Sequence, residues 1–349
     1  MTLLGTLGID RPLIQAPMAG VSTPSMAAAV SNAGGLGSLG IGASTAEAAR
    51  QSIADFRERS QRSVNINVFC HQPRRSTPDV EVGWLERLRP HFERVGAQPP
   101  TTLEEIYRSF LEDDAMLSLL LQEKPRVVSF HFGLPSPDRI RALREAGIVL
   151  LASATNVAEG QAAQNAGVHA VVAQGYEAGG HRGVFDPDAV DDCLGTMALT
   201  RLLVLQLDVP VIATGGIMDG AGVVAALRLG AAAAQLGTAF IACPESAADA
   251  GYRETLAGDG ASHTVMTRAI SGRPARCLRN RFTELGVDVS PQLIPGYPYA
   301  YDAGKALNAA AKAAHEAGYG AQWAGQGAPL ARSLPAAELV LALDQEMRV

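Results

Sequence analysis

The feature that most constrains the fold is a regular alternation of short apolar runs with longer segments of helical character. Thr23 followed by Pro24, for example, predicts the start of a helix that ends at Gly34 and Gly35. The expected strands cover residues 12–18, 36–41, 64–69, 127–132, 148–153, 170–174, 211–214 and 232–236. The expected helices between them cover residues 25–33, 45–62, 103–122, 137–146, 156–166, 191–207 and 220–229.

Nearly eight strand–helix steps in the first 245 residues predict an α/β fold with a parallel sheet, closed into a (β/α)8 TIM barrel. An open doubly wound sheet is the alternative. We expect the barrel over residues 1–245, with a polar, proline-bearing insertion at about 71–102 that contains one helix. Residues 246–330, with a helix at 303–317, are expected to form a smaller capping lobe that lines the substrate pocket. A helix at 336–347, within the segment 331–349, is expected to pack back on the barrel.

Charge and cysteine usage argue against several classes of partner. The 29 basic and 35 acidic residues give a net charge of −6 without a basic run, which predicts no nucleic-acid partner. No uncharged apolar run is long enough to span a bilayer, and no basic segment precedes the first apolar residues, so we expect neither a membrane nor a signal peptide. The four scattered cysteines form no CxxC pair, which predicts reduced thiols, a cytoplasmic location and no metal site.

The segment 171–183, VVAQGYEAGGHRG, has the pattern of an active-site loop. A buried strand ends at Gln174 and opens into a glycine-rich loop, and glycines let backbone N–H groups approach a ligand closely. The loop carries His181, the side-chain type best able to move a proton near neutral pH. The alternative is a turn whose histidine is merely exposed.

Two later strand ends have the pattern of a phosphate cradle. ATGGI at 213–217 and QLGTAF at 235–240 place backbone N–H groups and the Thr238 hydroxyl after strands seven and eight, where barrels frequently bind phosphate. We expect the N-terminus of a following helix to contribute. Neither a GxxxxGK[ST] motif nor a well-placed GxGxxG motif is present, which argues against a P-loop or a Rossmann site.

Five barrel segments together carry a resemblance: APMAGVSTPSMAAAVSNAGGLGSLG, SFHFGLP, AQGYEAGGHRG, PVIATGGI and QLGTAF. In this combination the chain resembles the FMN-dependent nitronate monooxygenases, formerly called 2-nitropropane dioxygenases. The motifs YPYAYDAGKALN at 297–308 and QWAGQGA at 322–328 are similar to those of the class I enzymes.

The resemblance implies a barrel that holds FMN at its carboxyl-terminal mouth. The positions implied for the cofactor are Ala16, Pro17, Met18, Asn67, Gln174, Gly179, Gly180, Gly215, Gly216, Gln235, Leu236, Gly237 and Thr238. His181 matches the family's active-site histidine, and a proton or hydrogen-bond role follows for it. The positions that match the family's substrate pocket are His131, Tyr107, Tyr297, Tyr301 and Lys305.

Each pocket residue also has a structural interpretation. His131 on an apolar strand could be a core histidine, and Lys305 could lie on the surface. Tyr297, Tyr299 and Tyr301 would share one face if their segment were extended, as packing aromatics of the lobe.

The implied chemistry is oxidation of a small anionic nitronate by O2, with propionate 3-nitronate as the expected substrate. The products would be malonic semialdehyde, nitrite and nitrate. A monomer and a homodimer are both compatible with the sequence. The first alternative is an NAD(P)H-dependent flavin reductase, of the quinone or enoyl-ACP reductase type, on the same barrel. Two further alternatives are a cysteine-dependent dehydrogenase of the inosine-monophosphate type and a non-enzymatic flavin- or phosphate-binding protein.

Overall fold

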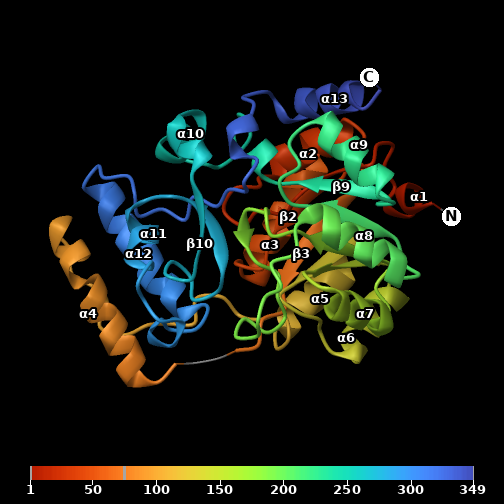
Figure 1. Cartoon of the computed structure of the whole chain (residues 1–349). Helices are drawn as coiled ribbons and strands as arrows, with labels where there is room; N and C mark the ends of the chain where they lie inside the picture. The colour runs from red at the N-terminus through yellow and green to blue at the C-terminus, as the bar shows by residue number, and fades with distance from the viewer. Residues whose placement is uncertain (1, 74–75, 349) are drawn as a thin grey trace.

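The computed structural model describes residues 2–73 and 76–348, which form a barrel with a smaller lobe beside it (Figure 1). Eight parallel strands make the barrel: β1 (Leu13–Gln15), β2 (Gly37–Gly40), β3 (Val64–Phe69), β4 (Val127–His131), β5 (Val149–Ala154), β6 (Ala170–Gln174), β8 (Val211–Thr214) and β9 (Ala233–Leu236). Their order is β1-β9-β8-β6-β5-β4-β3-β2. A parallel bridge between Ile14 and Leu36 joins β1 to β2, so the expected (β/α)8 barrel is confirmed over the open sheet.

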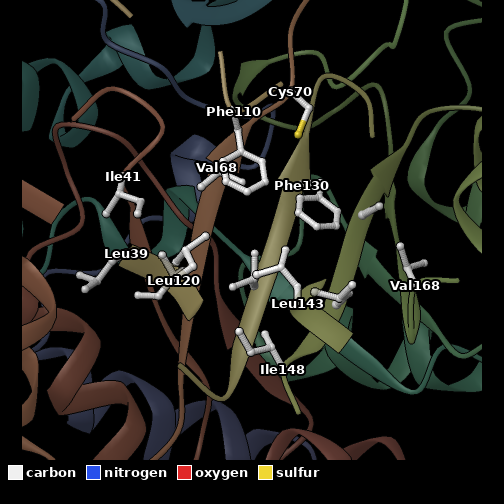
Figure 2. Packing of buried hydrophobic residues seen from close by; sticks show 14 of the residues in the cluster. Leu39, Ile41, Val68, Cys70, Phe110, Leu120, Phe130, Leu143, Ile148 and Val168 are labelled. Atoms are coloured by element: carbon white, nitrogen blue, oxygen red, sulfur yellow. The ribbon is translucent and has the colours of Figure 1, made fainter. Parts of the chain in front are cut away.

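Helices between the strands form the outer layer. They are α2 (Pro24–Asn32), α3 (Ala46–Arg59), α5 (Asp114–Glu123), α6 (Pro137–Glu145), α7 (Val157–Ala166), α8 (Thr196–Gln206) and α9 (Gly220–Arg228). Alternate strand residues face them: Val68 and Phe130 pack with Leu120 and Leu143 (Figure 2). The residues between these positions, such as Asn67, therefore face the barrel interior.

The barrel floor is closed by α1 (Leu3–Leu7), which the sequence pattern did not predict. Leu3 and Leu7 join one apolar cluster with Val127, Leu151 and Ile212 of the strands. The amino-terminal end of the barrel is therefore packed with apolar side chains, and the polar strand residues are left to the other end.

The predicted helix at 103–122 is wrong in its first half. The α5 helix begins at Asp114 because the Asp113 carboxylate accepts a hydrogen bond from the N–H of Met116, and residues before it are irregular. The predicted helix at 191–207 likewise begins late, at Thr196, because the Glu177 carboxylate accepts from the Thr196 N–H at 2.8 Å.

The capping lobe comprises α4 (Pro78–Arg94), α11 (Arg281–Leu285), α12 (Tyr299–Ala313) and a three-stranded sheet of β10 (Thr264–Thr267), β11 (Ala275–Leu278) and β7 (Gly180–His181). The helix of the 71–102 insertion, α4, lies beside α12 (Figure 1). It thus joins the lobe, while its neighbours in sequence belong to the barrel. The helix expected at 303–317 begins four residues earlier, at Tyr299. The extended arrangement of Tyr297, Tyr299 and Tyr301 is therefore wrong.

Two helices complete the chain: α10 (Ala250–Ala257) and α13 (Ala336–Glu346), with short 3-10 turns at Thr238–Phe240, Asp259–Ser262, Pro291–Leu293 and Ala328–Leu330. The α13 helix packs on α2 and α9, and Glu346 accepts from the N–H of Gly220 at 2.8 Å. The boundaries at 245 and 330 stay a prediction. None of the helices described is both long and apolar enough for a membrane span.

Candidate active site

A cavity of about 620 Å³ lies at the carboxyl ends of the barrel strands, and residues of the capping lobe complete its wall. All but one of the predicted site residues line it. These are Ala16, Pro17, Met18, Asn67, Tyr107, His131, Gln174, Gly179, Gly180, His181, Gly215, Gly216, Gln235, Gly237, Thr238, Tyr297, Tyr301 and Lys305. The barrel and the lobe therefore bring together residues that are almost 300 positions apart in the sequence.

Leu236 is the exception. Its side chain is 1% exposed and packs in an apolar cluster with Leu13, Met26 and Ala234. Its carbonyl accepts a hydrogen bond from the N–H of Ala16 at 2.8 Å. Leu236 thus positions the turn that starts at Ala16, and its own side chain does not reach the cavity.

Gly215 and Gly216 form the tightest turn of the expected phosphate cradle. Both have positive φ angles, +123° and +70°, and a Cβ on Gly215 would lie 2.7 Å from the Thr196 hydroxyl oxygen. Within the described chain, no hydrogen bond occupies the backbone N–H groups of Gly215, Gly216 or Gly237. These N–H groups line the cavity wall and remain available to an anion.

The expected contribution from a helix N-terminus stays a prediction, because two of the three helices that follow these strands are already capped. The N-terminus of α9 is already occupied by two carboxylates, because Asp219 accepts from the Gly222 N–H and Glu346 accepts from the Gly220 N–H, each at 2.8 Å. The α8 N-terminus is capped by Glu177 in the same way. A bound anion would therefore depend on the glycine turn and on the uncapped N-terminus of the 3-10 turn Thr238–Phe240, whose cap residue is Gly237.

His181 lies on β7, which pairs with β11 of the lobe. Its Nε2 is 2.9 Å from the Ser271 hydroxyl oxygen, and that hydroxyl in turn donates to the Arg273 carbonyl at 3.3 Å. With the Ser271 proton used in this way, the matching tautomer has Nε2–H as the donor and the lone pair on Nδ1; the opposite tautomer would have Ser271 donate to Nε2. No hydrogen bond among the described residues involves Nδ1, which leaves this nitrogen for a ligand.

His131 has both ring nitrogens engaged. Its Nε2 donates to the carbonyl of His181 at 3.2 Å, and its Nδ1 is 2.9 Å from the Ser153 hydroxyl oxygen. Gln174 donates to the same His181 carbonyl at 3.0 Å. Although both side chains line the cavity, these bonds fix the backbone of His181, so His131 positions the loop and keeps no free nitrogen for a substrate.

The histidines of the site are neutral at physiological pH. Burial lowers the pKa of His131 to about 4, with a smaller contribution from the Arg273 charge. Burial also lowers the pKa of His181 well below its ordinary value; protonation of His131 would act in the same direction, as does the Arg273 charge and as would protonation of His71. His181 can therefore accept a proton or a hydrogen bond.

Three phenols and an ammonium group line the cavity: Tyr107, from the irregular segment before α5, and Tyr297, Tyr301 and Lys305, from the lobe. Lys305 donates to the Tyr107 hydroxyl at 2.7 Å, which leaves the Tyr107 proton free for another acceptor. The Tyr297 hydroxyl is buried and has no partner among the described residues. Burial raises the pKa of Tyr107 to about 12 and that of Tyr297 well above 10, so both keep their protons as donors.

Several residues of the site were missed in the sequence. Trp323 lines the cavity with its ring 5.1 Å from that of His181, and Ser271 holds the His181 ring. Trp323 lies within the motif QWAGQGA, which was the available signal. Ser271 had no such signal, since its place depends on the pairing of Ala275 with His181 across 94 residues.

The cavity is poor in negative charge. Asp249 is the only acidic residue among the described residues that line it, and its carboxylate lies 2.6 Å from the Lys312 ammonium group. No cysteine lines it either; Cys70, Cys243 and Cys277 are buried, and burial raises the pKa of each thiol. The site thus favours an anionic ligand and offers no thiolate nucleophile.

Comparison with known proteins agrees with this chemistry. Residues 1–346 match the family model described as Nitronate monooxygenase. A relative from Paraburkholderia phytofirmans, named nitronate monooxygenase, is 63% identical over 346 residues, covering 99% of this chain and 94% of its own. The chain belongs to the nitronate monooxygenase family. The resemblance seen in the sequence is confirmed, and the protein is an oxidoreductase.

Two solved structures share the fold of this chain to different degrees. A nitroalkane oxidase from Streptomyces ansochromogenes matches with a TM-score of 0.91 at 39% identity, covering 99% of this chain and 98% of that one. FabK from Thermotoga maritima is more distant, with a TM-score of 0.74 at 28% identity, covering 99% of this chain and 95% of that one. The flavin reductase alternative is therefore the less supported one.

Proposed function

We propose that this member of the nitronate monooxygenase family binds FMN in the cavity and oxidises a small carboxylated nitronate, propionate 3-nitronate, with O2. The observation that carries the proposal is the arrangement of donors in the lobe. Lys305, Tyr107, Tyr297 and Tyr301 line the same cavity as the neutral His181, and the cavity has Asp249 as its only described acidic group. A small anion would find several donors and little repulsion there.

The residues present fit FMN. The free N–H groups of Gly215, Gly216 and Gly237 would hold its phosphate, and the turn at Ala16–Met18 with Asn67 would contact its ring system. When bound, the flavin supplies the electron-accepting and O2-reactive chemistry. The cytoplasmic location is also part of the proposal and is supported by the four free cysteines.

The lobe binds and orients the substrate in this proposal. The Lys305 ammonium group would pair with the substrate carboxylate, while the Tyr107 and Tyr297 hydroxyls donate to its oxygens. The paired glycine turn cannot do this because it lies on the barrel side, after β8. Substrate charge is thus recognised by the lobe and cofactor charge by the barrel.

His181 would hold the reacting end of the substrate. A preformed nitronate needs no deprotonation, so the His181 ring would act there as a hydrogen-bond partner, and its lone pair would act as a base only toward a neutral nitroalkane. The bonds from His131 and Gln174 to the His181 carbonyl keep this loop in place. The ring itself is packed between Tyr297, Tyr301 and Trp323.

The test is anaerobic mixing of the purified holoenzyme with propionate 3-nitronate and, separately, with NADH, while flavin absorbance is followed. We expect the nitronate to bleach the flavin within the enzyme's turnover time and NADH to leave it oxidised. Bleaching by NADH alone would assign the protein to the reductases on the same barrel. Bleaching by neither would leave a flavin-binding protein without this activity.

A further inference from the structure

Arg273 is a buried cation behind the active site that has no carboxylate partner. Its side chain is 3% exposed, it takes part in no ion pair among the described residues, and its Nε has no hydrogen-bond partner there. Its guanidinium group donates to the Val184 carbonyl and lies 4.3 Å from the centre of the Phe132 ring. Burying an unpaired charge is costly, so its presence calls for a functional explanation.

Three charged groups and one phenol lie near Arg273; the two acidic groups favour its charge from a distance, but none forms an ion pair with it among the described residues. These groups are Arg268, Glu159 and Asp186, together with the Tyr297 phenol. The Glu159 carboxylate is already used by the N–H and hydroxyl of Thr155 and by the N–H of Phe185. Burial lowers the pKa of Arg273 only to about 10, so the guanidinium group stays charged at neutral pH.

The Phe132 ring lies between this cation and the residues of the active site. Phe132 holds a left-handed backbone conformation with φ of +73°, an arrangement that costs energy for a bulky residue. One ring thereby contacts Arg273, lies 5.5 Å from the His181 ring edge-on, and lies 5.5 Å from the Tyr297 ring. The guanidinium group is thus one aromatic layer away from two residues that line the cavity.

Arg273 also reaches His181 through the backbone. Its carbonyl accepts from the Ser271 hydroxyl, whose oxygen is the partner of His181 Nε2. The residue therefore fixes the ring that would face the substrate and places a positive charge behind it.

We propose that Arg273 is a positioning residue whose buried charge, held in no ion pair among the described residues, serves as the counter-charge for the anionic substrate behind the Phe132 and His181 rings. The same charge disfavours protonation of His181 while that anion is bound. The proposal rests on the proposed function for the identity of the anion. It does not require Arg273 to touch the substrate. Because solvent screens charges poorly in the protein interior, a charge one side-chain layer from the cavity attracts an anion bound there.

The main test compares three forms of the holoenzyme: wild type, Arg273→Gln and Arg273→Lys. Glutamine keeps a donor for the Val184 carbonyl and removes the charge, whereas lysine keeps the charge and loses the planar stacking on Phe132. We expect Arg273→Gln to raise KM for the nitronate about tenfold and to shift the acid limb of the kcat/KM profile upward by about one pH unit. Arg273→Lys should stay close to wild type in both measurements.

A second readout does not depend on turnover. The chain has seven histidines, few enough for their ring signals to be followed by NMR as pH is changed. In wild type the His181 ring should stay neutral well below its ordinary pKa, which burial and the neighbouring charges depress. The His181 pKa should rise by about one unit in Arg273→Gln. The matched control is Arg268→Gln, because Arg268 faces Asp188 and its removal should leave the His181 pKa unchanged.

Three results would overturn the proposal. One is a His181 ring that titrates at its ordinary pKa in wild type. This result needs only the wild-type protein, so it can be obtained even if no variant folds. Another is an unchanged KM and His181 pKa in Arg273→Gln. The third is an equal increase in KM and an equal shift of the acid limb in Arg273→Lys and Arg273→Gln, which would show that the shape of the side chain matters and its charge does not. A failure of the nitronate to reduce the flavin would refute the proposed function and leave the NMR result standing.

Discussion

The cavity has two walls, and they differ in what their polar groups do. On the barrel wall the side chains of His131, Asn67 and Gln174 are used in hydrogen bonds to the protein itself. On the lobe wall the Tyr297 hydroxyl has no partner within the described residues and the Tyr107 proton is free. In the proposed function the side chains of the barrel wall therefore hold positions while its glycine N–H groups bind the cofactor, and the hydroxyls of the other wall bind the substrate.

His181 stands between the two walls and combines both properties. Its carbonyl is held by the barrel through His131 and Gln174, and its Nε2 is held by Ser271 of the lobe. Its Nδ1 remains free. A residue fixed at two points with one unoccupied nitrogen is suited to contact a reacting group, so the largest effect of a single substitution is expected here.

The first prediction concerns this residue. His181→Asn should lower kcat/KM for propionate 3-nitronate by about 100-fold, the scale of a lost proton or hydrogen-bond partner in the reaction. Steady-state O2 consumption measures it, with flavin content determined for each preparation. The control is His263→Asn on an exposed position away from the cavity, which should retain wild-type turnover. Unchanged turnover in His181→Asn would remove any catalytic role from the residue.

The barrel wall was largely predictable from the sequence. Residues at every second position of a strand face one way. In the run at 64–69, Asn65 and Asn67 therefore fall on the face toward the barrel interior, and the apolar residues between them fall on the face toward the helices. Polar residues such as Gln174 and His181 follow strand ends, and barrels bind ligands there. The position of the Leu236 side chain outside the cavity follows from the same rule, because in QLGT the side chains of Gln235 and Leu236 point to opposite faces.

The lobe wall could not be derived in this way. Its tyrosines and Lys305 were found only by resemblance, since no local pattern places α12 over a barrel more than 50 residues away in sequence. Ser271 and Arg273 were missed altogether, because a two-residue strand, β7, brings them to His181 through a long-range pairing. Short pairings of this kind leave no periodic signal.

The second prediction tests the binding role of the lobe. Lys305→Met should raise KM for propionate 3-nitronate about tenfold, since it removes one charge-assisted contact, and should leave kcat within about a factor of two. The effect should be smaller for a nitronate without a carboxylate, measured in the same assay. Lys312→Met is the matched control on the same helix, because the Lys312 ammonium group already pairs with Asp249 at 2.6 Å. An equal KM increase for both nitronates would break the distinction between the walls.

The last prediction concerns stability and applies to the barrel wall. Burial lowers the pKa of His131 to about 4 in the folded protein, whereas an unfolded histidine titrates near 6.5. Between these values the unfolded chain binds the proton and the folded one does not, so stability falls as pH decreases through this window. One such group contributes a slope of about 1.4 kcal/mol per pH unit.

His131→Gln should remove that share of the slope, because glutamine does not titrate and keeps a donor for the His181 carbonyl. Denaturant unfolding at a series of pH values between about 4 and 6.5 measures the slope. His315→Gln is the control, since His315 is exposed and should leave the slope unchanged. Lys305→Met should also leave it unchanged, because this substitution alters no buried histidine. If His131→Gln kept the full slope, the loss of stability at low pH would have to come from other buried histidines, such as His71 and His181.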